Sequence, residues 1–312
     1  MDNSKTQTRF VPHLGGIDVG HRLSQTPLDP AKPTVVLYNP FTATAAYYEP
    51  EFSNAALCAA VNLVAVEPLG HGKTRALKTE TYTYWDTAAM TLQLLDALGV
   101  DKFFALGTSQ GGWMTVRAAL LAPERVLGVI PVGSSMDYES EHSRAIGCWD
   151  GPGNTAGFVN QAGATAADLD PNFVPGDGYC DFLMHIGFGK HLTPAIRAAW
   201  DASLRANYHG PAGQRRIIMA AMALSTRDSL HARLPGVRCP VLWLQGTDDI
   251  VFSMQQAEED LPRFTHAPEK RLVRCEGGVH FLSATHAEKL HAELLAFVKK
   301  WSGRRTCGPE KL

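Results

Sequence analysis

Short apolar runs recur along the chain and are separated by longer segments in which apolar and polar residues mix. A continuous apolar run, unlike an alternating one, is typical of a strand that is buried on both faces. Strands of this kind occur in parallel sheets that helices cover on either side. The pattern therefore predicts an α/β fold with a mostly parallel central sheet. The runs are VVLY (35–38), LVAV (63–66), FFAL (103–106), LGVI (127–130), VLWL (241–244) and RLVRC (271–275).

Helical patterns with recognisable ends lie between these runs. In the segment 83–99, Thr83 can cap a helix together with Asp86 three residues later, and Gly99 can adopt the left-handed conformation that ends it. A second, amphipathic helix is predicted to close the chain over residues 285–301. Each helix has one apolar side, formed by Leu92, Leu95 and Leu98 in the first and by Leu290, Leu294, Val298 and Trp301 in the second.

A long insertion separates the fourth apolar run from the fifth. It is rich in Gly, Asp and Ala over residues 150–189 and becomes helical around Trp200. Roughly one hundred residues are too many for a loop, so we expect the insertion to fold as a mainly helical cap. This expectation divides the chain into a core of residues 1–134 and 236–312 and a cap of residues 135–235.

The composition of the chain limits the kinds of molecule that it is expected to bind. The 312 residues include 29 Lys and Arg against 31 Asp and Glu, which gives a net charge of −2. Without a basic surplus, neither nucleic acid nor an anionic membrane surface is an expected partner. No apolar run approaches the roughly 18 residues of a membrane span, and the amino terminus lacks the apolar stretch of a signal peptide. We therefore expect a soluble, cytoplasmic protein that acts on a small molecule.

The six cysteines are scattered and form neither a CxxC pair nor a Cys/His cluster with metal-ligand spacing. We interpret them mostly as buried thiols in a reducing compartment, and we expect no metal site. The last three residues, EKL, resemble the SKL-type peroxisomal ending, although Glu310 stands where a small residue is usual. A peroxisomal location is therefore the alternative to the cytoplasm.

Candidate chemistry begins at GTSQG (107–111), between the run FFAL and a predicted helix. A tight strand-to-helix turn needs glycine on both sides of its apex, and it exposes the apex side chain at the helix amino terminus. The motif points to Ser109 as a nucleophile; the alternative is a glycine-rich turn with an incidental serine. A serine nucleophile needs a histidine base that an acid orients. Asp248 and Asp249 follow one apolar run, and His280 follows the last.

The order of serine, acid and histidine, with an insertion before the acid-bearing strand, resembles the α/β-hydrolase superfamily over residues 15–301. The likeness is to its capped serine esterases and enol-lactonases. It implies that the catalytic acid lies three residues after Gly246, at Asp249, which leaves Asp248 as a turn residue. In a less common variant the acid follows the preceding strand, where Asp137 stands.

The other histidines are expected to have ordinary roles. His71 lies in EPLGHGKT, which resembles a loop of the family that is mostly structural, with Glu67 in place of the usual Asp. His286 and His291 fall on the closing helix, where a solvated or packing role is expected. His280 follows the bend at the two glycines 277–278, in a loop that can lean towards the serine, and is therefore the expected base.

The resemblance also implies two backbone N–H donors for the oxyanion of acyl transfer. Gln110 follows the serine at the helix amino terminus, where the helix dipole helps. In YNPFTATAAYY (38–48), Asn39 stands where the family commonly has His, as it does in enol-lactonase-like relatives, and Pro40 has no N–H. Phe41 is therefore the expected second donor; the alternative is that NPF only forms a turn.

These residues together predict a serine hydrolase that forms an acyl-enzyme and needs neither a metal nor an organic cofactor. The expected substrate is a small to medium, largely apolar ester, thioester or lactone, and hydrolysis of an activated C–C bond is also open. Dehalogenases and epoxide hydrolases of this fold use an aspartate nucleophile, so the serine disfavours both. An acyltransferase or lyase-like enzyme of the same fold and a non-catalytic ligand-binding relative are the alternatives, and a looser resemblance suggests fungal secondary metabolism. The candidate pocket residues are Phe41, Tyr47, Trp113, Trp149 and Phe182.

Overall fold

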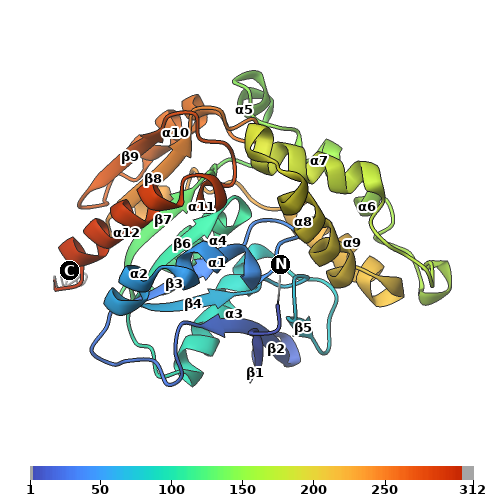
Figure 1. Cartoon of the computed structure of the whole chain (residues 1–312), viewed down its shortest axis with the longest axis horizontal. Helices are drawn as coiled ribbons and strands as arrows, with labels where there is room; N and C mark the ends of the chain where they lie inside the picture. Colours follow the sequence, from blue (N-terminus) through green and yellow to red (C-terminus); the bar gives the residue numbers. More distant parts are fainter. Residues whose placement is uncertain (1–2, 304–312) are drawn as a thin grey trace.

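The computed structural model describes residues 3–303 and consists of a central sheet with helices around it (Figure 1). Within these residues the sheet has nine strands in the order β1-β2-β4-β3-β6-β7-β8-β9, and β5 pairs with β2. From β4 to β9 neighbouring strands are parallel, whereas β1, β2, β4 and β5 are joined by antiparallel pairs. The predicted α/β fold is confirmed. The strands are β1 (Gln7–Val11), β2 (Ile17–Leu23), β3 (Thr34–Tyr38), β4 (Asn62–Val66), β5 (Arg75–Ala76), β6 (Phe103–Thr108), β7 (Val126–Val132), β8 (Val241–Gly246) and β9 (Lys270–Cys275).

Each of the six apolar runs forms a strand, and each strand but β9 is buried along its whole length. Successive residues point to opposite faces of the sheet, so a continuous apolar run supplies two cores at once. In β3, Val36 and Tyr38 belong to the core that also contains residues of α3 and α4, whereas Val35 and Leu37 belong to the core that contains residues of α12. The burial of both faces is the reason why these strands do not alternate.

The helix predicted over 83–99 has the ends that the sequence predicts, whereas the closing helix begins at Ala287, two residues after its predicted start. The Thr83 side chain and Asp86 form a reciprocal capping box at the start of α3, and Gly99 after its end has a φ of 70°. In the closing helix α12, Leu290 and Leu294 are buried, whereas Trp301 is half-buried. The core helices are α1 (Glu49–Ser53), α2 (Ala55–Ala60), α3 (Tyr84–Ala97), α4 (Gln110–Leu121), α10 (Met254–Asp260), α11 (Leu282–Thr285) and α12 (Ala287–Trp301).

The insertion between β7 and β8 is helical, and its helices lie together on one side of the sheet, at the upper right of Figure 1. Hydrogen bonds to backbone groups join it to the core at several places, and one of them runs from the Trp149 N–H to the Val251 carbonyl at 2.9 Å. The Phe281 N–H donates to the Gly187 carbonyl at 2.9 Å, and the Tyr208 hydroxyl donates to the Gly70 carbonyl at 3.1 Å. Its helices are α5 (Glu141–Ala145), α6 (Gly151–Val159), α7 (Asp177–Phe188), α8 (Pro194–Asn207) and α9 (Gly210–Ser225).

The cysteines within residues 3–303 are free thiols. Four of them are buried and Cys58 is half-buried, as the interpretation of buried thiols expects. Cys307 and the terminal EKL, on which the peroxisomal alternative rests, lie outside the described residues. Over the same described range, no helix combines the length and apolar character that crossing a membrane requires.

Candidate active site

Ser109 lies at the junction of β6 and α4, with a backbone φ of 56° and ψ of −122°. A positive φ is strained for a residue that carries a Cβ, and such strain is often found at functional turns. A Cβ at Gly107 would lie 2.1 Å from the Gly111 carbonyl oxygen, and one at Gly111 would lie 2.3 Å from the Tyr38 carbonyl oxygen. The close approach of strand and helix therefore requires both glycines of the motif.

Asp249 and His280 follow two neighbouring strands, β8 and β9, and their side chains meet. His280 Nδ1 lies 3.0 Å from Asp249 Oδ2, which also accepts a hydrogen bond from Gln245 Nε2 at 3.0 Å. The other carboxylate oxygen accepts the backbone N–H groups of Val251 and Phe252 at 2.8 and 3.1 Å. Four hydrogen bonds thus fix this buried carboxylate. A neutral imidazole that donates Nδ1–H to it carries its lone pair on Nε2, which can accept a proton.

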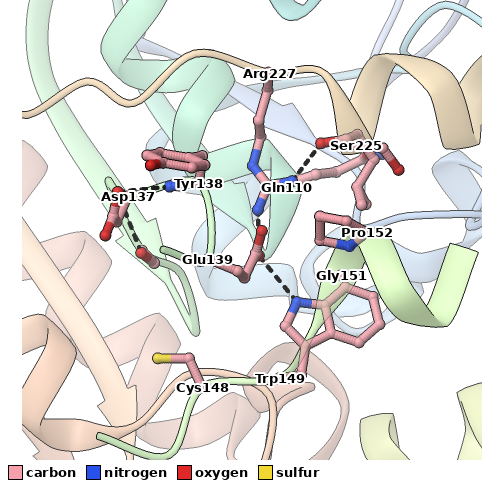
Figure 2. Close-up of polar contacts among 12 residues, drawn as sticks. Gln110, Asp137, Tyr138, Glu139, Cys148, Trp149, Gly151, Pro152, Ser225 and Arg227 are labelled. Carbon is pink, nitrogen blue, oxygen red and sulfur yellow. Dashed lines mark hydrogen bonds and ion pairs between the residues drawn. The ribbon is translucent and has the colours of Figure 1, made fainter. Parts of the chain in front are cut away.

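The two other candidate acids lie elsewhere. Asp248 is exposed and pairs with Lys190 Nζ at 2.7 Å, and this hydrogen bond lowers the pKa of the Asp248 carboxyl. Asp137 is buried, but its carboxylate accepts hydrogen bonds from the Tyr138 N–H at 2.9 Å and from the Ser140 hydroxyl, at the start of α5 (Figure 2). Between positions 3 and 303, no hydrogen bond joins Asp137 to His280.

Ser109 and His280 line the same small cavity, with a volume of about 20 Å³. No hydrogen bond joins the Ser109 hydroxyl to His280 in the part of the chain that the structure describes. Such contacts are often long before substrate binds. The rest of the wall is mostly apolar and comes from both the core and the insertion. It consists of Pro40, Phe41, Thr42, Trp149, Leu183, Ile186, Trp200, Val251 and Phe281.

Two of the predicted pocket residues, Phe41 and Trp149, lie in this wall. Three others pack behind it or away from it. The Tyr47 ring contacts the Phe281 ring edge-on at 5.2 Å, the buried Trp113 ring packs on Phe252 at 5.2 Å, and Phe182 is a half-buried residue of α7. From α7 it is therefore Leu183 and Ile186, three residues apart on one helix face, that line the cavity in place of the predicted Phe182.

The two segments that carry the candidate oxyanion donors are tied together by the Gln110 side chain. Its Nε2 donates to the Asn39 carbonyl at 3.3 Å and lies 3.0 Å from His71 Nε2, while its Oε1 accepts the Tyr84 hydroxyl at 2.9 Å. His71 also packs edge-on against the Phe41 ring, with centroids 6.0 Å apart. The histidine assigned to a structural loop therefore contacts both candidate donor residues, which the sequence analysis did not foresee.

His71 is held in its neutral form. Burial lowers the pKa of His71 to about 4, and its Nδ1 donates to the Leu69 carbonyl at 2.9 Å. The unfolded chain has an ordinary histidine pKa of about 6.5, so it takes up a proton on acidification before the folded state does.

Because of this difference, acidification from about pH 6.5 to pH 4 is expected to lower the free energy of unfolding through His71. In His71→Asn this contribution is absent, and the variant should have a shallower pH slope by up to about 1.4 kcal/mol per pH unit. Urea unfolding of both proteins at pH 7, 6 and 5 measures the two slopes. Equal slopes would show that His71 does not titrate differently in the folded state.

The remaining histidines of the closing helix pack as expected. His291 is buried, and its Nδ1 hydrogen-bonds Asn54 Nδ2 at 2.9 Å, while its Nε2 lies 3.4 Å from buried Glu51. His286 is half-buried beside the Thr285 hydroxyl at 3.0 Å. Neither residue lines the cavity that contains Ser109.

A buried ion pair supports one wall of the cavity (Figure 2). Glu139 and Arg227 pair with side chains that are 1% and 3% exposed. The Trp149 indole N–H donates to Glu139 Oε1 at 3.0 Å, and the Arg227 guanidinium lies over the Trp113 ring, 4.4 Å from its centroid. Since Trp149 lines the cavity, the pair fixes the orientation of a wall residue. No motif marked either charge in the sequence.

Comparisons with known proteins agree with the fold. A family model described as alpha/beta hydrolase fold matches residues 33–287. RutD, a candidate carbamate hydrolase of Stutzerimonas stutzeri (strain A1501), is 21% identical over 280 residues, which cover 89% of this chain and 96% of that protein.

Two solved structures resemble the chain along most of its length. An enol-lactonase from Burkholderia xenovorans LB400 gives a TM-score of 0.73 at 18% identity, covering 93% of this chain and 100% of that one. A thermophilic esterase from Thermogutta terrifontis gives a TM-score of 0.73 at 16% identity, covering 94% and 98%. At these identities the likeness concerns the fold.

Proposed function

The chain belongs to the alpha/beta hydrolase fold family, and from that premise we propose that it cleaves an ester, thioester or lactone through an acyl-enzyme on Ser109. The observation that carries the proposal is the shared cavity: the strained serine and a histidine oriented by a buried carboxylate line the same small space. A nucleophile, a base and an orienting acid are the three parts that acyl transfer by serine requires.

In the proposed reaction, Ser109 Oγ attacks the substrate carbonyl carbon and its proton passes to His280 Nε2. The Asp249 carboxylate stabilises the imidazolium through Nδ1–H. The backbone N–H groups of Gln110 and Phe41 would donate to the oxyanion, a contribution typically worth about a hundredfold to a thousandfold for each donor. The histidine then protonates the leaving group, and a water molecule, deprotonated by the same imidazole, releases the acyl group and restores the serine.

We assign residues 135–235 as the cap and residues 1–134 and 236–312 as the core. Trp149, Leu183, Ile186 and Trp200 come from the insertion and close the cavity over Ser109. A volume of about 20 Å³ holds little more than one water molecule. A substrate therefore requires the cap to move away from the core before it can reach the serine.

The residues that line the cavity favour a largely apolar substrate. Besides the hydroxyls of Ser109 and Thr42, the His280 imidazole and two indoles, the side chains of the cavity wall are apolar, and the lining residues within positions 3–303 include no Asp, Glu, Lys or Arg. An acyl group bearing a charge would lose its hydration there without a partner. Small to medium apolar acyl groups are the substrates that fit this wall, and product analysis with water and with alcohol acceptors separates hydrolysis from acyl transfer.

Asp249→Asn is expected to lower kcat for p-nitrophenyl butyrate by about 10³- to 10⁴-fold, because the amide no longer holds the productive histidine tautomer. Asp137→Asn is the matched control, since the Asp137 carboxylate accepts hydrogen bonds from Tyr138 and Ser140 just before α5, and its kcat should stay within a few-fold of wild type. A large loss of kcat in Asp137→Asn together with a small loss in Asp249→Asn would instead identify Asp137 as the catalytic acid. A folded wild type that turns over no ester, thioester or lactone would contradict the proposed function.

A further inference from the structure

A second cavity lies between the insertion and the core and shares no lining residue with the candidate active site. Helices α8 and α9 form one wall, and β5 with the segment before it forms another. Its volume is about 320 Å³. Sites for small molecules range from about 300 to 1,000 Å³, so this cavity has room for a compact ligand.

Three cationic side chains line this second cavity: Lys73, Arg75 and Arg216. Across positions 3–303 none of them forms an ion pair with a carboxylate, so their charges are not neutralised by the protein at short range. A carbonyl oxygen accepts a hydrogen bond but carries no net charge. The hydrogen bonds that the three side chains donate go to the carbonyls of Thr6, Gly72, Thr74, Asn207 and Ala212.

Two donors of the lining residues are buried without a partner. Arg216 Nε and Asn207 Nδ2 have no hydrogen-bond acceptor within the described chain. Leaving a buried donor unpaired typically costs about 1–3 kcal/mol, and more for a charged group. An acceptor oxygen of a ligand that reaches either group would remove this cost.

The electrostatic balance of the cavity is positive. Glu67, whose charge acts on Arg75, is buried and accepts hydrogen bonds from the Ala45 N–H and Asn3 Nδ2, each at 2.9 Å, and from the Lys73 N–H. Among the described residues that line the cavity there are three cations and no carboxylate. Burial lowers the pKa of both guanidinium groups, and the charge of Arg75 lowers the pKa of Arg216 further. An anion would relieve this repulsion.

We propose that this second cavity binds the phosphate or pyrophosphate group of a small molecule. The planar guanidinium fork matches phosphate oxygens in pairs, and lysine contributes a point charge. Because Arg216 belongs to the insertion whereas Lys73 and Arg75 belong to the core, a bound anion ties the two parts together. The anion therefore stabilises the position of the insertion that the structure shows.

This binding site is independent of the proposed hydrolase activity, and its test uses binding alone. Pyrophosphate, inorganic phosphate and ADP are titrated separately into the full chain by calorimetry at low salt, with thermal unfolding measured alongside. We expect saturable 1:1 binding of pyrophosphate with a Kd below about 1 mM and a rise in Tm that grows with its concentration. If ADP binds as tightly as pyrophosphate, the site recognises the phosphate groups alone. If ADP binds more tightly, the site also contacts the nucleoside. Either result supports the site.

Arg216→Gln and Lys73→Gln are expected to weaken pyrophosphate binding about tenfold or more, because each removes a charge-assisted hydrogen bond. Lys73 is exposed, so its substitution leaves the fold intact. Arg215→Gln is the matched control: this neighbour on α9 pairs with Glu80 outside the cavity and should keep wild-type affinity. Absence of saturable binding up to about 10 mM, or equal affinity in all three variants, would overturn the proposal.

Discussion

Replacing Ser109 with alanine is expected to lower kcat/KM for p-nitrophenyl butyrate by about 10⁴- to 10⁶-fold. The substitution removes the hydroxyl that we propose as the nucleophile, in the cavity that Ser109 shares with His280. The fold should persist, since the hydroxyl forms no hydrogen bond within residues 3–303 and alanine is smaller. Steady-state kinetics give the loss, and thermal unfolding verifies that the variant remains folded.

Ser109→Gly serves as a second variant with a different effect on stability. Glycine adopts a φ of 56° without strain, so this variant should be as inactive as the alanine variant but at least as stable thermally. Turnover by either variant above a few per cent of wild type would contradict the assignment of the nucleophile. Loss of activity together with unfolding in both would instead make Ser109 a structural residue.

Glu139→Gln is expected to lower the free energy of unfolding by about 3–5 kcal/mol, because it leaves the Arg227 charge buried and uncompensated. Neither side chain is more than 3% exposed, so water cannot replace the lost partner. The surface pair of Asp248 and Lys190 provides a matched control: Asp248→Asn should cost less than about 1 kcal/mol. Denaturant unfolding measures both changes in the free energy of unfolding, provided that the variants have the same m-value as wild type.

The double variant Glu139→Gln with Arg227→Met tests whether the loss in the free energy of unfolding comes from the unpaired Arg227 charge. Removing the second charge as well should recover part of the stability, since no isolated buried charge is left. Arg227→Met also removes the cation over Trp113, so full recovery is not expected. A Glu139→Gln variant as stable as Asp248→Asn would show that the buried pair does not support the cavity wall.

The buried strands and β9 at one edge could be predicted from the sequence, whereas the antiparallel edge formed by β1, β2 and β5 could not. β3, β4, β6, β7 and β8 are covered on both faces, so each is a continuous apolar run. β1 exposes four of its five residues, and β2 contains Gly20, His21 and Arg22. β5 has two residues. Tertiary pairing rather than local pattern defines these strands.

In the candidate site, too, the residues under local constraints could be predicted and the long-range contacts could not. Ser109 was predictable because the tight turn imposes glycines at fixed offsets, which is a local constraint. The structure brings the predicted His280 and Asp249 together, and their catalytic roles remain predictions. The ion pair of Glu139 and Arg227 joins residues 88 positions apart, and no local pattern records such a contact.

Covalent labelling with a fluorophosphonate probe, read by intact mass, tests the central claim most directly. We expect the wild type to gain one adduct, located on Ser109 by peptide mapping. Ser109→Ala should gain none, and His280→Ala should react about 10³-fold more slowly, because its serine lacks the base. A folded wild type that does not react, or a Ser109→Ala variant that reacts as fast, would contradict an activated serine at this site.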